Sequence, residues 1–231
     1  MPHKSLASSP ALKGGASARQ NLVNPNTTLL AIFTCEAHKD KLAAQQATWI
    51  PEVVSRGYDV EVFDGTRLGI DDSRAGLAEK TRAICRWATS KPYQSLAKID
   101  DDVYIHTDRF VEYADDYVGS RIHPQNGNAD FAYGFLYYLS RRAFTYLAQS
   151  DISPGITWEE DQWVGNRLSA AGIPLTDISQ MLCTSIQKSG SGVMAIGQLE
   201  TAHRIWEMHD ARHGKIAAPP SAYGYHSKRT K

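Results

Sequence analysis

The stretch Leu96-Ala-Lys-Ile-Asp-Asp-Asp-Val-Tyr-Ile105 places three consecutive carboxylates between two short apolar runs. Like charges this close repel one another, so the arrangement is costly unless a cation or a set of hydrogen-bond donors compensates. In an extended chain, Asp100 and Asp102 would point to one side and Asp101 to the other. Two carboxylates on one side suit Mg²⁺ or Mn²⁺, which completes its octahedral shell with water and phosphate oxygens.

The segments before the triplet decide between this metal site and a simpler interpretation, in which the acids form a solvated turn or a helix N-cap. The apolar, β-branched run at 28–34 is typical of a strand buried on both faces. Strand and helix patterns then alternate, which predicts a doubly wound α/β fold with the triplet at the carboxyl end of the third strand, where ligands bind. The predicted strands are 28–34, 58–63 and a third ending at Ile99, and the helices are 39–56, broken at Pro51, and 73–90.

A second acidic element follows the triplet. Residues 158–168 predict a helix whose first turn carries Glu159, Glu160 and Asp161. Acids in that position usually serve the helix dipole, which accounts for one of them. If this turn faces the metal site, a carboxylate that stays off the ion can act as a general base. The other predicted elements are helices at 107–118, 140–149 (capped by Ser140) and 198–213, and a strand at 129–139.

Length and composition indicate one domain and argue against several functions. The 231 residues suit a single α/β domain at 27–231, preceded by a flexible tail at 1–26 that lacks hydrophobic periodicity. Basic and acidic residues number 25 each, so there is no electrostatic case for binding nucleic acid or anionic membranes. We expect a soluble protein, because no transmembrane segment or signal peptide is recognisable. The cysteines Cys35, Cys85 and Cys183 lack metal-ligand spacing and are expected to be reduced thiols.

Five segments carry a family resemblance. They are Ala-Thr-Trp at 47–49, Gly-Leu-Ala-Glu-Lys-Thr at 76–81 with Trp87, Lys-Ile-Asp-Asp-Asp-Val at 98–103, Tyr-Gly-Phe-Leu-Tyr-Tyr-Leu-Ser at 133–140, and Glu-Asp-Gln-Trp-Val-Gly at 160–165. In this order they resemble the motifs of the β1,3-glycosyltransferases of family 31, which include the Fringe-like enzymes. The resemblance covers residues 28–170, and agreement among several ordered motifs lowers the false-positive risk of each.

The resemblance implies a GT-A fold that takes a UDP-sugar with Mn²⁺ or Mg²⁺ and forms a β linkage with inversion. In the family pattern, Asp100 and Asp102 would hold the ion against the diphosphate, and Asp101 would face the sugar or the ribose. Lys80 and Gly134 would lie beside the donor, although a surface lysine on an amphipathic helix is the commoner explanation of Lys80.

The resemblance also implies the groups that act on the acceptor. Asp161 would accept the proton of the attacking hydroxyl, and Glu160 would orient the helix or the acceptor. Family members often take a third metal ligand from a late histidine. Here we favour His226 over His203, because histidines on the predicted helix at 198–213 are more often packed or surface residues. The late histidines are His203, His209, His213 and His226.

The chain also departs from the family pattern. Gln45 and Gln46 stand where family members usually carry an apolar residue and an arginine, and Leu136 replaces a glycine. The membrane anchor of many members is missing as well. The sequence therefore favours a soluble, cytoplasmic enzyme of microbial or viral type over a Golgi enzyme.

Partners and alternatives complete the sequence-based interpretation. The expected partners are a nucleotide sugar and a glycan or glycoconjugate acceptor, and Tyr133, Tyr137 and Trp158 would either stack on a sugar ring or fill the core. Two other functions stay open. One is a metal-dependent phosphoesterase or nucleotidyltransferase, which also gathers acids around Mg²⁺. The other is a non-catalytic sugar-binding protein with the same fold.

Overall fold

The computed structural model describes residues 27–125, 127–152, 159–184 and 192–213. Its first strand, β1 (Thr28–Phe33), is fully buried, as the continuous apolar run predicts. Leu30 and Ile32 enter one hydrophobic core, whereas Leu29 and Ala31 enter a second core on the other side of the sheet. The predicted tail at 1–26 lies outside the described residues, as do His226 and Trp158.

The central sheet has six strands in the order β2-β1-β3-β6-β5-β7. Its other strands are β2 (Asp59–Phe63), β3 (Ser95–Asp100), β5 (Tyr117–Ile122), β6 (Phe131–Ser140) and β7 (Thr176–Asp177). Only β6 runs opposite to the rest, because its pairings with β3 and β5 are antiparallel while the other three pairings are parallel. The predicted α/β fold with a mostly parallel sheet is confirmed.

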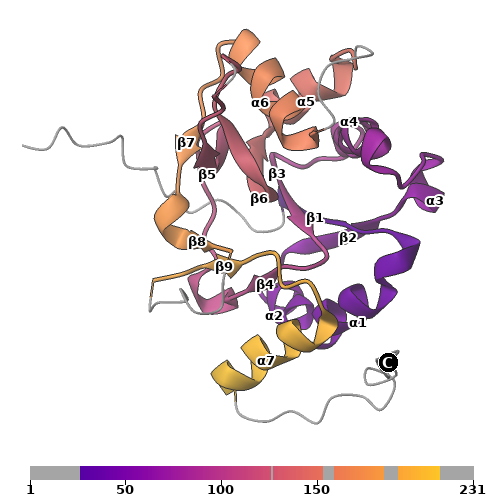
Figure 1. Ribbon diagram of the computed structural model, residues 1–231, viewed down its shortest axis with the longest axis vertical. Helices are drawn as coiled ribbons and strands as arrows, with labels where there is room; N and C mark the ends of the chain where they lie inside the picture. The colour runs from indigo at the N-terminus through magenta and orange to yellow at the C-terminus, as the bar shows by residue number, and fades with distance from the viewer. Residues whose placement is uncertain (1–26, 126, 153–158, 185–191, 214–231) are drawn as a thin grey trace, which may run out of the picture.

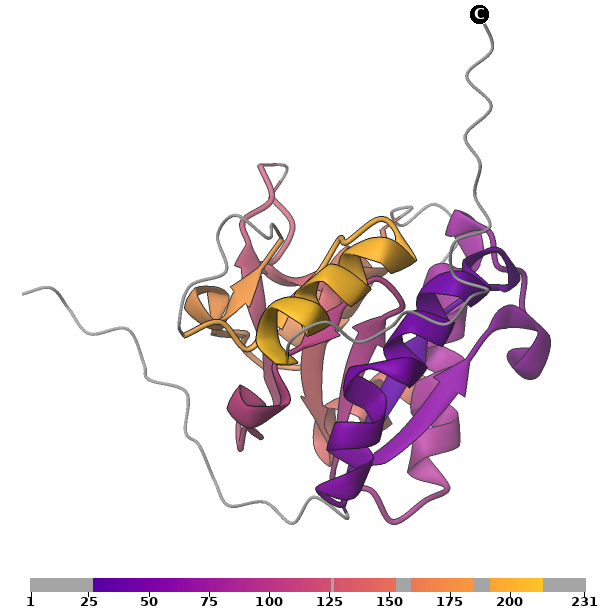
Figure 2. The same cartoon turned by 90° about the horizontal axis from the view of Figure 1, so that it is seen from below.

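Helices cover both faces of this sheet (Figure 1). One face carries α4 (Leu77–Thr89), α5 (Arg141–Gln149) and α6 (Glu160–Ala170), which bury the second core. The other face carries α1 (Lys39–Ala47), α2 (Trp49–Ser55) and α7 (Ala202–His213), and α7 lies beside α1 (Figure 2). The short helix α3 (Gly65–Leu68) follows β2.

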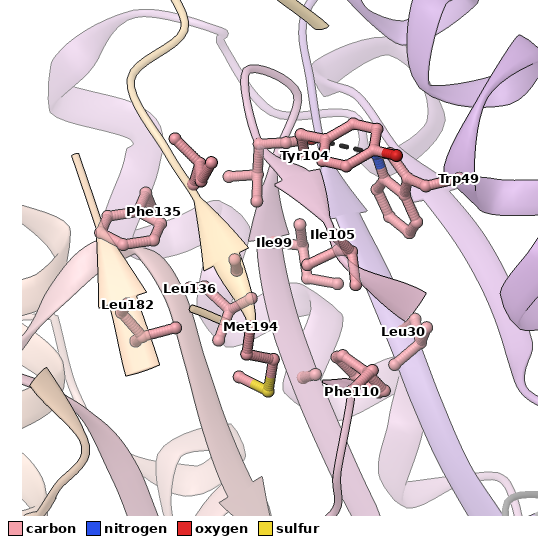
Figure 3. Close-up of a cluster of buried hydrophobic side chains, with 14 of the residues drawn as sticks. Leu30, Trp49, Ile99, Tyr104, Ile105, Phe110, Phe135, Leu136, Leu182 and Met194 are labelled. Carbon is pink, nitrogen blue, oxygen red and sulfur yellow. Dashed lines mark hydrogen bonds between the residues drawn. The ribbon is translucent and has the colours of Figure 1, made fainter. Parts of the chain in front are cut away.

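A small three-stranded sheet completes the face that carries α7. It has the order β4-β9-β8, with β4 (Tyr104–Ile105), β8 (Leu182–Cys183) and β9 (Ala195–Ile196). Figure 3 shows side chains from both sheets and from α2 converging in one core, among them Leu30, Trp49 and Tyr104. This core fixes the chain directly after the Asp triplet, because β4 is fully buried.

Two predicted helices differ from the structure. The break in the helix at 39–56 lies at Thr48 and not at Pro51, which is tolerated in the first turn of α2 because its missing N–H has no helical acceptor there. The helix predicted at 107–118 is wrong: a 3₁₀ turn (Thr107–Arg109) is followed by irregular chain up to β5. Phe110 and Tyr113 anchor this segment in the core, and such packing overrides local helical spacing.

Other local predictions hold. The Ser140 hydroxyl oxygen accepts a hydrogen bond from the Ala143 N–H at 3.2 Å and caps α5. The three cysteines form no disulfide. Among the described residues, no helix is both long and apolar enough to cross a membrane.

Candidate active site

A cavity of about 540 Å³ opens at the carboxyl ends of β1 and β3 and at the start of α6. Seven of the sequence-predicted site residues line this one cavity. They are Lys80, Asp100, Asp101, Asp102, Gly134, Glu160 and Asp161. Two acidic segments about 60 residues apart in sequence therefore face a common space of the size that small-molecule ligands occupy.

The triplet itself forms a turn. Strand β3 ends at Asp100, and the next two residues turn away from the strand, so the predicted alternation of side chains across an extended segment is wrong. The backbone of the turn is tied to neighbouring segments, since the Asp101 N–H donates to the Phe33 carbonyl at 3.2 Å and the Leu199 N–H donates to the Asp102 carbonyl at 3.1 Å. All three carboxylate residues reach the cavity wall as a result.

The physical reason for the turn is Gln45 on α1. Its Nε2 donates to the carbonyl oxygens of Asp100 at 2.9 Å and Val103 at 2.8 Å, which brackets the turn from both ends. The Trp49 indole N–H also donates to the Val103 carbonyl, at 3.0 Å. Gln45 is fully buried, whereas Gln46 beside it is exposed. The sequence signal was an amide at a position where members of family 31 usually carry an apolar residue. That signal did not predict that Gln45 positions the turn.

Burial changes the acidity of the last two triplet residues. Asp101 is buried, and its Oδ2 lies 3.0 Å from the His38 Nδ1. Burial raises the pKa of Asp101 despite the opposing influence of Thr34 and His38. Burial and the charge of Asp100 likewise raise the pKa of Asp102. Both carboxylates are therefore held at an energetic cost that a cation in the cavity would relieve.

Lys98 links the two acidic segments. Its side chain is 4% exposed, and its Nζ donates to the Asp100 Oδ1 at 2.5 Å and to the Gly134 carbonyl at 2.6 Å. The same Nζ lies 3.7 Å from the Glu160 Oε2. Burial alone would lower the pKa of Lys98, but the charges of Asp100 and Glu160 outweigh burial and raise it. The sequence pattern places Lys98 within the motif at 98–103 and predicts no separate role for it.

Lys80 is also an interior residue. Its Nζ donates to the Asp72 Oδ1 at 2.5 Å and to the Thr34 carbonyl oxygen, and the residue is 1% exposed. The commoner explanation, a surface lysine on an amphipathic helix, is therefore wrong for this chain. Lys80 instead brings a fixed positive charge to the cavity wall at the end of β1.

Glu160 and Asp161 begin α6 but have different surroundings. Glu160 is buried, and its Oε1 accepts hydrogen bonds from the Thr81 hydroxyl at 2.8 Å and from the Tyr137 hydroxyl. These contacts fasten the first turn of α6 to α4 and β6. They suit Glu160 to orienting the helix. Glu159 also lines the cavity but pairs with Arg74, so Asp161 is the acid of this segment without a basic partner in hydrogen-bond contact among the described residues.

Asp161 has the acidity of a base poised near neutral pH. Burial and the neighbouring Glu160 raise its pKa to about 6, although its Oδ1 accepts a hydrogen bond from the Gln162 N–H at 2.8 Å. Gly134 leaves room for this carboxylate, because a Cβ at position 134 would lie 3.2 Å from the Asp161 Oδ2. Position 134 therefore shapes the space around the proposed base.

The aromatic residues Tyr133 and Tyr137, both candidates for contact with a sugar ring, have different positions in the structure. Tyr133 lines the cavity, and its hydroxyl accepts a hydrogen bond from the Gln198 Nε2 at 2.5 Å. Tyr137 is fully buried, so for this residue the core interpretation is correct. Among the described residues, Tyr133 is left as a candidate for stacking on a sugar ring, and Trp158 lies outside them.

The donor chemistry of the cavity fits a hard divalent cation. Asp100 and Asp102 supply carboxylate oxygens, the ligands that Mg²⁺ and Mn²⁺ prefer. Lys98 engages the Asp100 Oδ1, so Oδ2 is the oxygen left for an ion. His203 does not contribute to this wall; its side chain is 64% exposed and pairs with Glu207 on α7.

Comparisons with known proteins agree with the fold. No protein-family model matches the sequence, and no curated protein matches it. A glycosyltransferase involved in the glycosylation of the major capsid of PBCV-1 is similar in structure, with a TM-score of 0.57, 12% sequence identity, and coverage of 78% of this chain and 98% of that one. A mutant of Drosophila β1,4-galactosyltransferase 7, in complex with manganese, UDP-Gal and xylobiose, gives a TM-score of 0.45 and 16% identity over 73% and 69% of the two chains.

The first of these likenesses shows that the chain shares the fold of that glycosyltransferase, in agreement with the predicted GT-A type. At 12% identity it shows the fold alone. Membership of family 31 stays a prediction, as do the roles of the individual site residues.

Proposed function

We propose that the protein is a metal-dependent inverting glycosyltransferase, which moves a hexose from a UDP-sugar to an acceptor hydroxyl and forms a β linkage. One observation carries this proposal: the Asp triplet and the Glu160-Asp161 pair line a single cavity and are joined through Lys98. Donor activation and proton removal from the acceptor need two acidic groups with different tasks in one site. The resemblance to family 31 favours a β1,3 linkage to a glycan.

The proposed tasks follow from the surroundings of each group. Asp100 and Asp102 would hold Mn²⁺ or Mg²⁺, which supplies Lewis-acid stabilisation of the departing diphosphate when it is bound. Lys80 adds a positive charge at the end of β1, where the anionic donor would lie. Asp101, fixed by His38, would face the sugar or the ribose.

Asp161 would act as the general base. With a pKa of about 6 it is mostly ionised at neutral pH, yet it is a stronger base than an ordinary aspartate. It would take the acceptor hydroxyl proton as that oxygen attacks the anomeric carbon and the bond to UDP breaks. Glu160, held by Thr81 and Tyr137, would keep the first turn of α6 in place during this step.

The test measures UDP release from a panel of UDP-hexoses and acceptors, with Mn²⁺ or with EDTA. We expect metal-dependent release that falls by about 10²- to 10⁴-fold in Asp161→Asn, the usual contribution of a general base. Asp102→Ala should lose activity as well. Asp151→Asn is the matched control, since Asp151 is exposed and lies outside the cavity.

The products separate this function from the alternatives. A phosphoesterase would release UMP or phosphate and leave the acceptor unchanged, whereas a non-catalytic protein would bind the UDP-sugar without turnover. The proposal is refuted if no donor gives metal-dependent UDP release, or if Asp102→Ala and Asp161→Asn are as active as the parent.

A further inference from the structure

A second group of metal-ligating side chains lies on the face of the sheet that carries α2 and α7. It consists of Glu52 on α2 and of His209 and His213, one helical turn apart on α7. One ligand atom from each of the three residues lies within 4.8 Å of the others, and the His213 Nε2 is 3.1 Å from the Glu52 Oε1. None of the three residues lines the cavity of the candidate active site.

Neighbouring groups fix the direction of the Glu52 carboxylate. The Thr107 hydroxyl donates to its Oε2, and the Arg212 Nη1 donates to the same oxygen at 3.2 Å. Oε1 is thereby left directed at His213. Hydrogen bonds of this kind to a ligating carboxylate are the usual outer support of a metal site.

A similar contact orients His209. Its ring is buried, and its Nδ1 lies 3.3 Å from the Tyr104 hydroxyl, which leaves Nε2 as the nitrogen for an ion.

The positive charge of Arg212 is the feature that would oppose a cation here. That charge is already compensated, because the Arg212 Nη2 pairs with the Asp108 Oδ1 at 2.9 Å while Nη1 contacts Glu52. The three residues therefore offer one carboxylate and two imidazole nitrogens, which is the composition of many three-ligand zinc sites.

We propose that Glu52, His209 and His213 form a metal site, separate from the cavity, for a transition-metal ion of the Zn²⁺ class. The spacing fits: atoms bound to one tetrahedral ion at about 2.0 to 2.2 Å from the metal lie roughly 3.3 to 3.6 Å apart. The Glu52 and His213 atoms are close to that separation already. Two imidazoles and one carboxylate leave a fourth position for water and favour Zn²⁺ or Co²⁺ over Mg²⁺.

A bound ion would fasten α7 to α2 and to the segment after β4. The simpler alternative is that these groups form only an ion-pair network between the same elements. The two possibilities differ in a measurable way, because only the metal site binds a stoichiometric transition-metal ion with nitrogen ligands.

The test titrates the full-length, chelator-treated protein with Co²⁺ and records visible absorption, in which four-coordinate nitrogen and oxygen sites absorb much more strongly than octahedral oxygen sites. We expect one equivalent to produce the strong band, and Zn²⁺ to displace it. The Asp102→Ala variant should keep the band, so this result is independent of whether the proposed glycosyl transfer is correct. His213→Ala should lose it.

Two further variants test whether Co²⁺ binds at these three residues. Glu52→Gln has nearly the same shape as the parent and should weaken Co²⁺ binding at least tenfold even if His213→Ala folds poorly. His203→Ala is the matched control on the same helix, because His203 is exposed and pairs only with Glu207 among the described residues. The proposal is overturned if the parent gives no strong band, or if the band survives both His213→Ala and Glu52→Gln.

Discussion

Replacing Asp161 with asparagine should stabilise the fold at neutral pH while it removes the proposed activity. Burial and Glu160 raise the pKa of Asp161 from 3.8 to about 6, so the folded protein disfavours the charged carboxylate. The contribution of Asp161 to the free energy of unfolding is therefore fully present below about pH 4 and is lost as the pH rises through about 6. At 1.36 kcal/mol per pKa unit, the loss at neutral pH is at most about 3 kcal/mol.

Urea unfolding of the parent and of Asp161→Asn between about pH 4 and pH 8 measures this difference. The two proteins should have similar unfolding free energies near pH 4, and the variant should gain stability with increasing pH until a plateau is reached above about pH 6. Asparagine can still accept the hydrogen bond from the Gln162 N–H, so that contact is retained.

Asp177→Asn is a control of opposite sign. Burial raises the pKa of Asp177, but hydrogen bonds from Ser179 and Arg121 outweigh burial and lower it, so this substitution should destabilise the protein at neutral pH. The reasoning about Asp161 fails if Asp161→Asn is less stable than the parent at pH 7, or if its stability difference does not depend on pH.

Four further predictions concern the same site and its supports. If Asp161 is the general base as proposed, UDP release by the parent should rise about tenfold per pH unit below the Asp161 pKa of about 6 and then level off, as a pH–rate profile would show. Gln45→Leu should cost about 1 to 3 kcal/mol in urea unfolding, because the Asp100 carbonyl loses this side-chain donor and the buried Val103 carbonyl keeps only the Trp49 indole N–H as a side-chain donor. The exposed Gln46→Leu should cost less than about 0.5 kcal/mol, and equal effects of the two changes would contradict the role assigned to the buried amide. Lys98→Met leaves two neighbouring carboxylates uncompensated and should cost about 3 to 5 kcal/mol at neutral pH and less in acid, measured by the same method. Gly165→Ala should lower stability by about 1 to 3 kcal/mol, since the added Cβ would lie 2.4 Å from a side-chain atom of β6, and an unchanged melting temperature would refute this close approach.

The alternation of strands and helices was predictable because each element carries its own signal. The apolar run at 28–34 and the Ser140 cap both correspond to local patterns, and the structure confirms both. The helix predicted at 107–118 was wrong because Phe110 and Tyr113 are held by a core that is built from distant segments. A window of local sequence contains no information about that core.

The candidate site shows the same division between local and distant causes. The triplet and the Glu160-Asp161 pair were recognisable from residue type and order, and the cavity brings them together. The turn at the triplet was not predictable, because its shape depends on Gln45, an amide 55 residues away from Asp100. The bridging role of Lys98 was hidden for a similar reason, since it needs the carbonyl of Gly134 and the acid of Glu160.

The tie between the Leu199 N–H and the Asp102 carbonyl has a consequence for biosynthesis. Strand β3 and α1 leave the ribosome early, but the segment that closes the triplet turn from the other side is translated almost 100 residues later. Contacts between segments so far apart in sequence form late in folding. A nascent chain that ends before residue 199 would therefore carry both acidic segments without the finished turn at the triplet, so we expect the cavity to take its final shape only near the end of synthesis.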